Sequence, residues 1–221
     1  MLDWNNIDTV LLDMDGTLLD LEFDNYFWQE HVPQAYAAKH GISTKESTDQ
    51  ISPLFDIGRG TLDWYCVDAW SERLGLDIPA LKQELGDRIQ LRPFALEFLQ
   101  QLHSSHRRVL LVTNAHRKTL EIKMGRVDIS QWFDALVVSH ELNSPKEQRS
   151  FWEKLQRLHP FDRERTLLID DTEAVLDSAQ AYGIKHLLTL VQPDSQQQKR
   201  LNTRFPGIHH FDEIMPDCLS Q

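Results

Sequence analysis

The chain has 221 residues, of which 41% are hydrophobic, and a formal net charge of -11 at pH 7. A chain of this length can bury one hydrophobic core and still carry a sizeable insertion, so we expect a globular protein. The negative charge argues against binding to nucleic-acid polymers, because such binding needs a basic surface. A small anionic ligand that is held through a bound cation remains compatible with this charge.

The amino-terminal sequence MLDWNNIDTV has acidic residues and no basic stretch followed by a long apolar run. Nowhere do about 18 apolar residues follow one another, which a membrane-spanning helix would require. The two cysteines, Cys66 and Cys218, lie far apart and outside any zinc-ligand spacing. We therefore expect a cytoplasmic protein with free thiols, and neither secretion nor contact with a membrane.

Five short apolar runs predict the strands of one sheet. Because each run is apolar on both faces, it fits a strand that is buried on both sides of a parallel sheet. In chain order the runs are Thr9–Asp13, Val109–Thr113, Ala135–Ser139, Thr166–Asp170 and His186–Leu190. Helical spacing of apolar residues is found between them, at Phe94, Phe98, Leu99 and Leu102, at Phe151, Trp152, Leu155 and Leu158, and at Val175, Leu176 and Ala179, ending at Gly183. This alternation predicts a doubly wound α/β fold.

The segment from Leu21 to Leu91 interrupts this alternation, because it has no convincing strand pattern of its own. We predict a helical insertion there, so that residues 1–20 and 92–221 form the α/β core and residues 21–91 a small helical domain. Two of its helices should be rich in aromatic residues, one with Phe23, Tyr26, Phe27 and Trp28 and the other with Leu62, Trp64, Tyr65, Val67 and Trp70. At helical spacing such side chains are more typical of packing than of a platform for a nucleobase. From His209 onward we expect a loosely specified tail.

Polar groups follow several predicted strands at their carboxyl ends, which is the edge where ligands bind in an open α/β sheet. The first strand leads into Asp13-Met14-Asp15-Gly16-Thr17, with two carboxylates separated by one residue and a glycine that permits a sharp turn. One carboxylate can attack phosphorus to form an aspartyl-phosphate. The other can move protons to the leaving group and from the incoming water.

Positive and neutral groups at the same edge can hold a phosphate beside these carboxylates. Thr113 and Asn114 end the second strand with a hydroxyl and an amide that suit a phosphoryl oxygen. Lys146 stands in Ser144-Pro145-Lys146, at the expected start of a helix, where Pro145 suits the first turn. Its ammonium can neutralise the charge that spreads over the phosphoryl oxygens.

A second acidic pair, Asp170-Asp171, follows the fourth strand. On its own such a pair is more typical of the amino-terminal cap of a helix, here one over Thr172 to Tyr182. Together with Asp13, however, the pair offers the hard oxygen ligands that Mg²⁺ prefers, with room for water and a substrate oxygen. The ion would then orient and shield the phosphate for in-line attack.

The DMDGT segment, Thr113, Lys146 and the Asp170-Asp171 pair, in this order and spacing, resemble the four motifs of the haloacid dehalogenase-like (HAD) superfamily. The resemblance covers nearly the whole chain and implies a Rossmann-like parallel sheet. It makes Asp13 the nucleophile, Asp15 the general acid and base, and Thr113 and Lys146 the phosphate anchors. Asp171 would bind the metal directly with Asp170 close by, and the Asp13 carboxylate and the backbone carbonyl of Asp15 would complete the protein's ligands. Mg²⁺ would be the cofactor, with Mn²⁺ or Co²⁺ as substitutes.

The helical insertion directly after the first motif matches the small mobile cap of the subgroup that contains phosphoglycolate phosphatase and β-phosphoglucomutase. Such caps close over the substrate, exclude water and select the leaving group. The stretches LLDMDGTLLDLEFDNYFW, LDWYCVDAWSERLGLDI, LLVTNAH and ERTLLIDDTEAVLDSA resemble the bacterial HAD nucleotidases that hydrolyse GMP and IMP. The resemblance therefore implies a purine 5′-nucleotidase that acts on a nucleoside monophosphate.

Two alternatives stay open at this point. The same core could belong to a phosphatase or phosphomutase for a sugar phosphate or another small metabolite, because no sequence feature separates water from another phosphoryl acceptor. A regulatory phosphate-binding protein is the non-enzymatic alternative, since receiver domains also combine clustered aspartates with a threonine and a lysine. Receivers, however, carry their acidic pair first and have no large insertion after the first strand.

Overall fold

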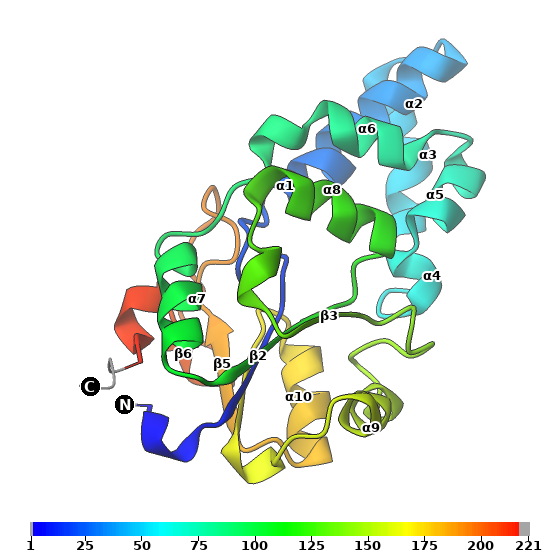
Figure 1. Ribbon diagram of the computed structural model, residues 1–221. Helices are drawn as coiled ribbons and strands as arrows, with labels where there is room; N and C mark the ends of the chain where they lie inside the picture. The colour runs from blue at the N-terminus through cyan, green and yellow to red at the C-terminus, as the bar shows by residue number, and fades with distance from the viewer. Residues whose placement is uncertain (1, 217–221) are drawn as a thin grey trace.

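The computed structural model describes residues 2–216 (Figure 1). Within these residues a parallel sheet of six strands has the order β3-β2-β1-β4-β5-β6. The strands are β1 (Thr9–Leu12), β2 (Arg108–Thr113), β3 (Ala135–Val138), β4 (Thr166–Ile169), β5 (His186–Leu190) and β6 (Gly207–Ile208). The first five follow the predicted apolar runs, and the Rossmann-like α/β fold is confirmed.

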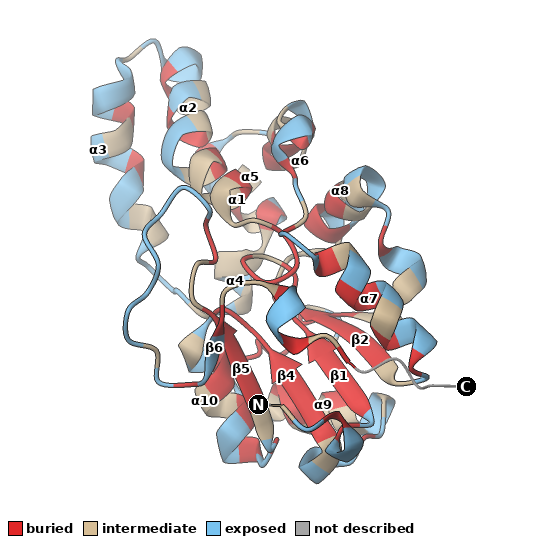
Figure 2. Cartoon of the chain, turned by 90° about the vertical axis from the view of Figure 1, so that its left-hand side faces the viewer, coloured by how far each residue is buried: buried red, intermediate tan, exposed pale blue. Residues whose placement is uncertain are grey.

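The sheet is buried on both faces, as the apolar runs predicted (Figure 2). Side chains alternate along β1, so that Val10 and Leu12 join one hydrophobic cluster and Leu11 joins the other. Helices α7 (Ala95–Ser104) and α8 (Arg117–Val127) contribute to the first cluster. Helices α9 (Arg149–Leu158) and α10 (Glu173–Tyr182) contribute to the second. The central strand is therefore fixed from both sides, which makes its carboxyl end a rigid position.

The segment between β1 and α7 is helical and lies beyond the carboxyl edge of the sheet (Figure 1). Its elements are α1 (Glu22–Tyr26), a π-helix (Phe27–His31), α2 (Val32–His40), α3 (Thr44–Phe55), α4 (Leu62–Tyr65), α5 (Val67–Leu74) and α6 (Ile78–Glu84). The π-helix, α2, α3, α5 and α6 share a third buried cluster, made of Phe27, Val32, Ile51, Val67, Trp70, Leu74 and Ile78. The division of the chain into domains at residues 20 and 92 stays a prediction. None of the helices in residues 2–216 has the length and apolar character to cross a bilayer.

The two chain segments that join the insertion to the sheet run side by side. Leu19 pairs with Leu91 in an antiparallel bridge. The Asp20 N–H donates to the Gln90 carbonyl at 3.0 Å, and the Arg92 N–H donates to the Leu18 carbonyl at 2.9 Å. The two covalent connections between the insertion and the sheet are thus paired with each other.

The second aromatic-rich helix of the insertion is interrupted, which the sequence analysis missed. Cys66 has extended backbone angles, φ -83° and ψ 109°, and separates α4 from α5. Its N–H closes α4 on the Asp63 carbonyl, and its own carbonyl accepts the first bond of α5 from Trp70. The break lets Trp70 pack inside the insertion, 5.5 Å from the Trp28 ring, while Tyr65 turns toward the sheet. Trp28 and Trp70 are therefore packing residues, as their spacing indicated.

The expectation of a loosely specified tail from His209 is wrong for the residues that the structure describes there. After β6 a short 3-10 helix (Phe211–Ile214) docks on the sheet layer, and Phe211 is fully buried. Its ring stacks on Phe98 with 4.8 Å between centroids, and the Trp4 indole donates to the Ile214 carbonyl at 3.0 Å. This segment has too few apolar residues to show a helical or strand period, and the residues that it contacts lie far away in the sequence. Cys218 and the other residues 217–221 lie outside the described residues.

Replacement of Phe211 by alanine should lower the free energy of unfolding by about 3–5 kcal/mol, because it leaves a cavity in the packed layer. Urea unfolding monitored by circular dichroism measures this change. The neighbouring exposed Asp212→Ala variant is the control and should stay within about 0.5 kcal/mol of the wild type. Equal stability of the two variants would show that the 3-10 helix does not contribute to the fold.

Candidate active site

The parallel register of the central strands brings three predicted site segments together. Leu12 of β1 lies beside Leu111 of β2 on one side and Ile169 of β4 on the other. The residues that follow, Asp13 and Asp170 among them, therefore leave the sheet at the same edge. The Asp13 N–H continues the ladder by donating to the Ile169 carbonyl at 3.0 Å. Asp13 is thus held by the backbone at the centre of this edge.

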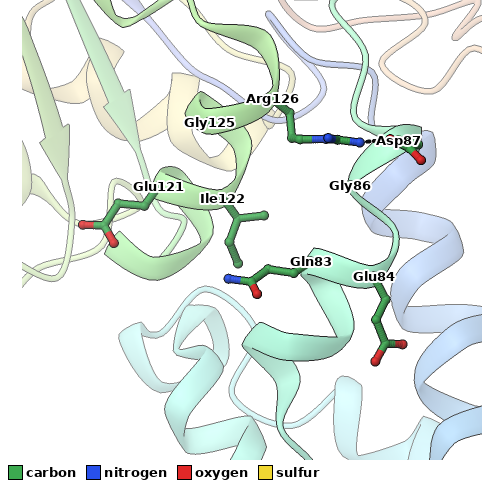
Figure 3. Close-up of a pocket in the computed structure, with 8 residues that line it drawn as sticks. All are labelled: Gln83, Glu84, Gly86, Asp87, Glu121, Ile122, Gly125 and Arg126. Atoms are coloured by element: carbon green, nitrogen blue, oxygen red, sulfur yellow. Dashed lines mark ion pairs between the residues drawn. The ribbon is translucent and has the colours of Figure 1, made fainter.

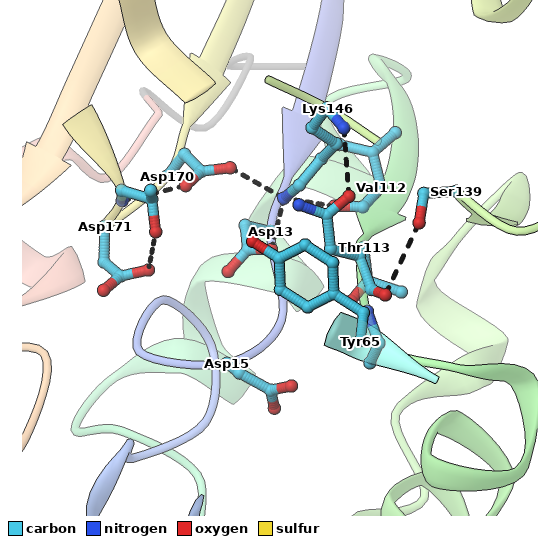
Figure 4. A network of polar contacts seen from close by, with 12 residues as sticks. Asp13, Asp15, Tyr65, Val112, Thr113, Ser139, Lys146, Asp170 and Asp171 are labelled. Carbon is cyan, nitrogen blue, oxygen red and sulfur yellow. Dashed lines mark hydrogen bonds and ion pairs between the residues drawn. The ribbon is translucent and has the colours of Figure 1, made fainter. Parts of the chain in front are cut away.

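Lys146 lies at the middle of the candidate site, and its side chain is only 2% exposed (Figure 4). Its ammonium donates to Asp13 Oδ1, to Asp170 Oδ2 at 2.7 Å and to the Val112 carbonyl at 3.0 Å. These three contacts match the three N–H donors of a lysine. Burial alone would lower the pKa of Lys146, but the two carboxylates raise it well above its usual value. The group therefore carries a fixed positive charge beside Asp13.

The expectation that Lys146 begins a helix is wrong, because α9 starts only at Arg149. The Gln148 N–H donates to the Pro145 carbonyl at 3.0 Å and closes a turn there instead. The Lys146 N–H donates to Asn114 Oδ1, also at 3.0 Å. Since this backbone group is tied to the end of β2, the lysine sits in a loop that the neighbouring strand holds in place.

The side chain of Asn114 is committed to this loop. Its Oδ1 accepts from the Lys146 backbone, and its Nδ2 donates to Glu147 Oε2 at 3.0 Å. The other Glu147 oxygen, Oε1, accepts from the Tyr65 hydroxyl of the insertion. Thr113 is buried, and its hydroxyl accepts from the Ala115 N–H at 3.0 Å. Contacts of Thr113 and Asn114 with a phosphate stay a prediction.

Three buried carboxylates, Asp13, Asp170 and Asp171, place one oxygen each within 4.8 Å of one another. Burial raises the pKa of Asp13 to about 7 and that of Asp170 to about 6, and neighbouring carboxylates add to both shifts. Burial likewise raises the pKa of Asp171 to about 7, with Asp13 contributing. Lys146 contacts two of these carboxylates and the Arg200 guanidinium lies 3.7 Å from the third, so three acidic groups face two cations. Such a set of oxygen donors fits a hard divalent cation.

Gly16 allows the chain to turn back against these carboxylates. Its φ of +81° lies in the left-handed region that favours glycine. A Cβ atom at this position would lie 2.7 Å from Asp171 Cγ. Glycine is therefore required both by the backbone angle and by the close approach of Asp171.

The side chain of Asp15 is turned away from Asp13 and Lys146 (Figure 4). Its Oδ1 accepts from the ammonium of Lys123 in α8. Sequence reasoning missed Lys123, since a lysine on a helix is usually solvated, yet this side chain is only 1% exposed. It also missed Glu147, Tyr65 and Arg200. The Arg200 guanidinium donates to the Asp171 carbonyl at 2.6 Å from a loop without a motif.

Mg²⁺ should stabilise the folded protein, because the carboxylate cluster exists only in the native state. At 100 times its dissociation constant, a ligand that binds one native site adds about 2.7 kcal/mol, which thermal unfolding with and without Mg²⁺ detects. Gly16→Ala should abolish this shift by displacing Asp171. Gly41→Ala is the matched control, because Gly41 also has a positive φ, +66°, but its Cβ would meet nothing within 4 Å. If Gly16→Ala kept the full Mg²⁺ shift, the cation site would not be at this cluster.

Comparison with known proteins places this geometry in a family. Residues 7–183 match the model of the haloacid dehalogenase-like hydrolases. The GMP/IMP nucleotidase YrfG of Escherichia coli K12 is 40% identical over 216 residues, which cover 98% of this chain and 97% of that protein. Among solved structures, the HAD phosphatase from Thermococcus onnurineus has a TM-score of 0.76 at 20% identity and covers 94% of this chain and 95% of its own. A putative β-phosphoglucomutase from Thermotoga maritima has a TM-score of 0.59 at 19% identity, with 84% and 86% covered.

These two structures share the fold of this chain, whereas the family model and the nucleotidase match it in sequence over most of its length. The segments matched include all the strand ends at which Asp13, Lys146 and Asp170 meet. The chain belongs to the haloacid dehalogenase-like hydrolase family.

Proposed function

We propose that this protein is a Mg²⁺-dependent phosphomonoesterase that dephosphorylates purine 5′-nucleotides, with GMP and IMP as its preferred substrates. The observation that carries the chemistry is the position of Asp13, a buried carboxylate between the Lys146 ammonium and the Asp170-Asp171 pair. The choice of substrate is supported by the 40% identity with a GMP/IMP nucleotidase over 98% of the chain. A cytoplasmic location, consistent with the free thiol of Cys66, is part of the proposal.

In the first step an Asp13 carboxylate oxygen attacks phosphorus, and the bond between phosphorus and the nucleoside 5′-oxygen breaks. Asp15 gives its proton to that oxygen, and the nucleoside leaves as a neutral alcohol. In the second step water attacks the phosphorus of the aspartyl-phosphate and gives a proton to Asp15. Inorganic phosphate leaves, and the Asp13 carboxylate is restored.

Lys146 supports both steps from a fixed position. Its ammonium contacts Asp13 Oδ1, so it lies beside the phosphoryl oxygens on which negative charge develops during attack. Asn114 and Val112 hold the lysine in place, so its positive charge is already positioned when this charge appears. Thr113, at the end of the adjacent strand, is the second proposed phosphate anchor.

The cation would be held by the carboxylates of Asp13 and Asp171 and by the backbone carbonyl of Asp15, with Asp170 close by. Asp170 already contacts the Lys146 ammonium and accepts from the Thr172 N–H at 2.9 Å. Asp171 has longer contacts, with the Thr172 hydroxyl at 3.3 Å and with the partly exposed Arg200 at 3.7 Å. It is therefore the better direct ligand. When bound, Mg²⁺ supplies charge neutralisation and alignment of the phosphate.

With Mg²⁺, GMP and IMP should release phosphate faster than AMP, pyrimidine nucleotides, phosphoglycolate or sugar phosphates. Phosphate release across this panel measures the preference, and EDTA should abolish it until Mg²⁺ is restored. A preference for phosphoglycolate or a sugar phosphate would leave the chemistry of Asp13 intact and overturn the purine assignment. Silence on every ester would favour the regulatory phosphate-binding alternative.

Asp13→Asn should lower kcat for GMP by at least about 1,000-fold, because the amide cannot act as the nucleophile. Steady-state phosphate release gives kcat, and acid quenching with labelled substrate detects the aspartyl-phosphate in the wild type and its loss in the variant. Asp212→Asn makes the same chemical change at an exposed position and should retain full activity. Substantial turnover by folded Asp13→Asn would contradict the mechanism.

A further inference from the structure

A chain of four charged side chains, two buried lysines and two partly buried aspartates, runs from Asp15 into the helical insertion. The Lys123 ammonium contacts Asp15 Oδ1 on one side and Asp24 Oδ2, in α1, on the other. Asp24 Oδ1 in turn accepts from the ammonium of Lys82, in α6, at 2.8 Å. The side chains of the two lysines are only 1% and 2% exposed. Neither Lys123 nor Lys82 takes part in the chemistry assigned to Asp13 and Lys146.

Burial of these charges is tolerable because they alternate in sign. Two ammonium groups and two carboxylates balance, whereas removal of one member leaves an uncompensated buried charge. Aromatic rings line the chain, with Lys82 Nζ 4.3 Å from the centroid of Phe27 and Lys123 Nζ 5.2 Å from that of Phe23. Although burial would raise the pKa of Asp24, its two ammonium neighbours hold it well below its usual value. Asp24 is therefore a permanent anion between two cations.

The chain of charges crosses the boundary between the sheet layer and the insertion. Asp15 follows β1 and Lys123 lies in α8, whereas Asp24 and Lys82 lie in α1 and α6 of the insertion. Near this crossing a pocket of about 330 Å³ lies between α6 and α8 (Figure 3). Across it Arg126 pairs with the exposed carboxylate of Asp87. The contact of Asp24 with Lys123 is thus a buried ion pair across this boundary, beside a pocket and a second, exposed pair.

We propose that Lys123 is a positioning residue that holds the carboxyl group of Asp15 in its working orientation, and that Asp24 couples this orientation to the seating of the insertion. The inference rests on the proposed function, in which Asp15 protonates the leaving oxygen. Because Oδ1 of Asp15 accepts from Lys123 Nζ, Oδ2 is the oxygen that this contact leaves available to give a proton to the leaving group. In that step the Oδ2–H bond breaks and the new O–H bond forms on the nucleoside 5′-oxygen.

Loss of each member of this chain of charges should affect the orientation of Asp15 differently. Without the Lys123 ammonium, the carboxylates of Asp15 and Asp24 would face each other and repel, so Asp15 would turn away from the leaving oxygen. Without the Asp24 carboxylate, Lys123 would lose its contact with the insertion and keep only its contact with Asp15. Loss of Lys82 would disturb only the far end of the chain, because its partner is Asp24.

Two phosphate esters separate the positioning of an acid from general damage to the fold. GMP has an alkoxide leaving group that needs a proton, whereas 4-nitrophenyl phosphate releases a stable phenolate that does not. The value of kcat/KM covers only the steps up to formation of the aspartyl-phosphate. It therefore reports directly how much each leaving group depends on a proton from Asp15. In Lys123→Met we expect kcat/KM to fall about 100-fold for GMP and less than about fivefold for 4-nitrophenyl phosphate.

Lys82→Met is the matched control, since it removes an equally buried ammonium from the same carboxylate. It should lower the melting temperature and leave the ratio of the two kcat/KM values within about twofold of the wild type. The proposal would be overturned if kcat/KM fell equally for both esters in folded Lys123→Met. It would also be overturned if the ratio of the two kcat/KM values changed as much in Lys82→Met as in Lys123→Met.

Asp24→Asn decides the matter if Lys123→Met does not fold, because the amide keeps the shape of the side chain. We expect a selective loss of about tenfold for GMP, and an unchanged ratio would refute the coupling to the insertion. Wild-type protein that hydrolysed neither ester would instead overturn the proposed function, and this inference with it.

Discussion

The contact of the Lys146 ammonium with Asp13 and Asp170 is the interaction on which the site depends. Two carboxylates buried this deeply would repel each other and lose their water without compensation. The lysine resolves both problems, but only because the strand ends and Asn114 fix its position. The parallel register of β1, β2 and β4 is thus a requirement of the electrostatics, since a shift of one residue would separate the charges.

The same site keeps an excess of negative charge when its carboxylates are ionised, because Asp171 joins the other two and adds only the partly exposed Arg200 to the cations. The buried layers on both faces of the sheet provide the stability that offsets this repulsion. The absence of a side chain at Gly16 leaves room for Asp171 to lie beside the other carboxylates. Repulsion stored in this way is what makes the cluster receptive to a cation.

The sequence predicted the sheet and the residues at its edge because both follow from local patterns. A strand buried on two sides must be apolar throughout, and parallel strands bring the residues after Asp13 and Asp170 to one place. The position of Lys146 in a loop was not predictable, because the contact with Asn114 that replaces a helical start is not local. Lys123 was missed for a related reason. A lysine on a helix is usually solvated. Only the contact with Asp24, which is far away in the sequence, explains why Lys123 is buried.

Two separate lines of contacts connect the insertion to the site. One runs from Tyr65 through Glu147 and Asn114 to the backbone of Lys146, the residue proposed to anchor the phosphate. The other runs from Asp24 through Lys123 to Asp15, the proposed acid for the leaving oxygen. Under the proposed mechanism the insertion can therefore influence the two ends of the breaking bond separately. A substrate that seats the insertion incorrectly would be held by its phosphate and still lack a well-placed acid, so discrimination can be expressed in the chemical step as well as in binding.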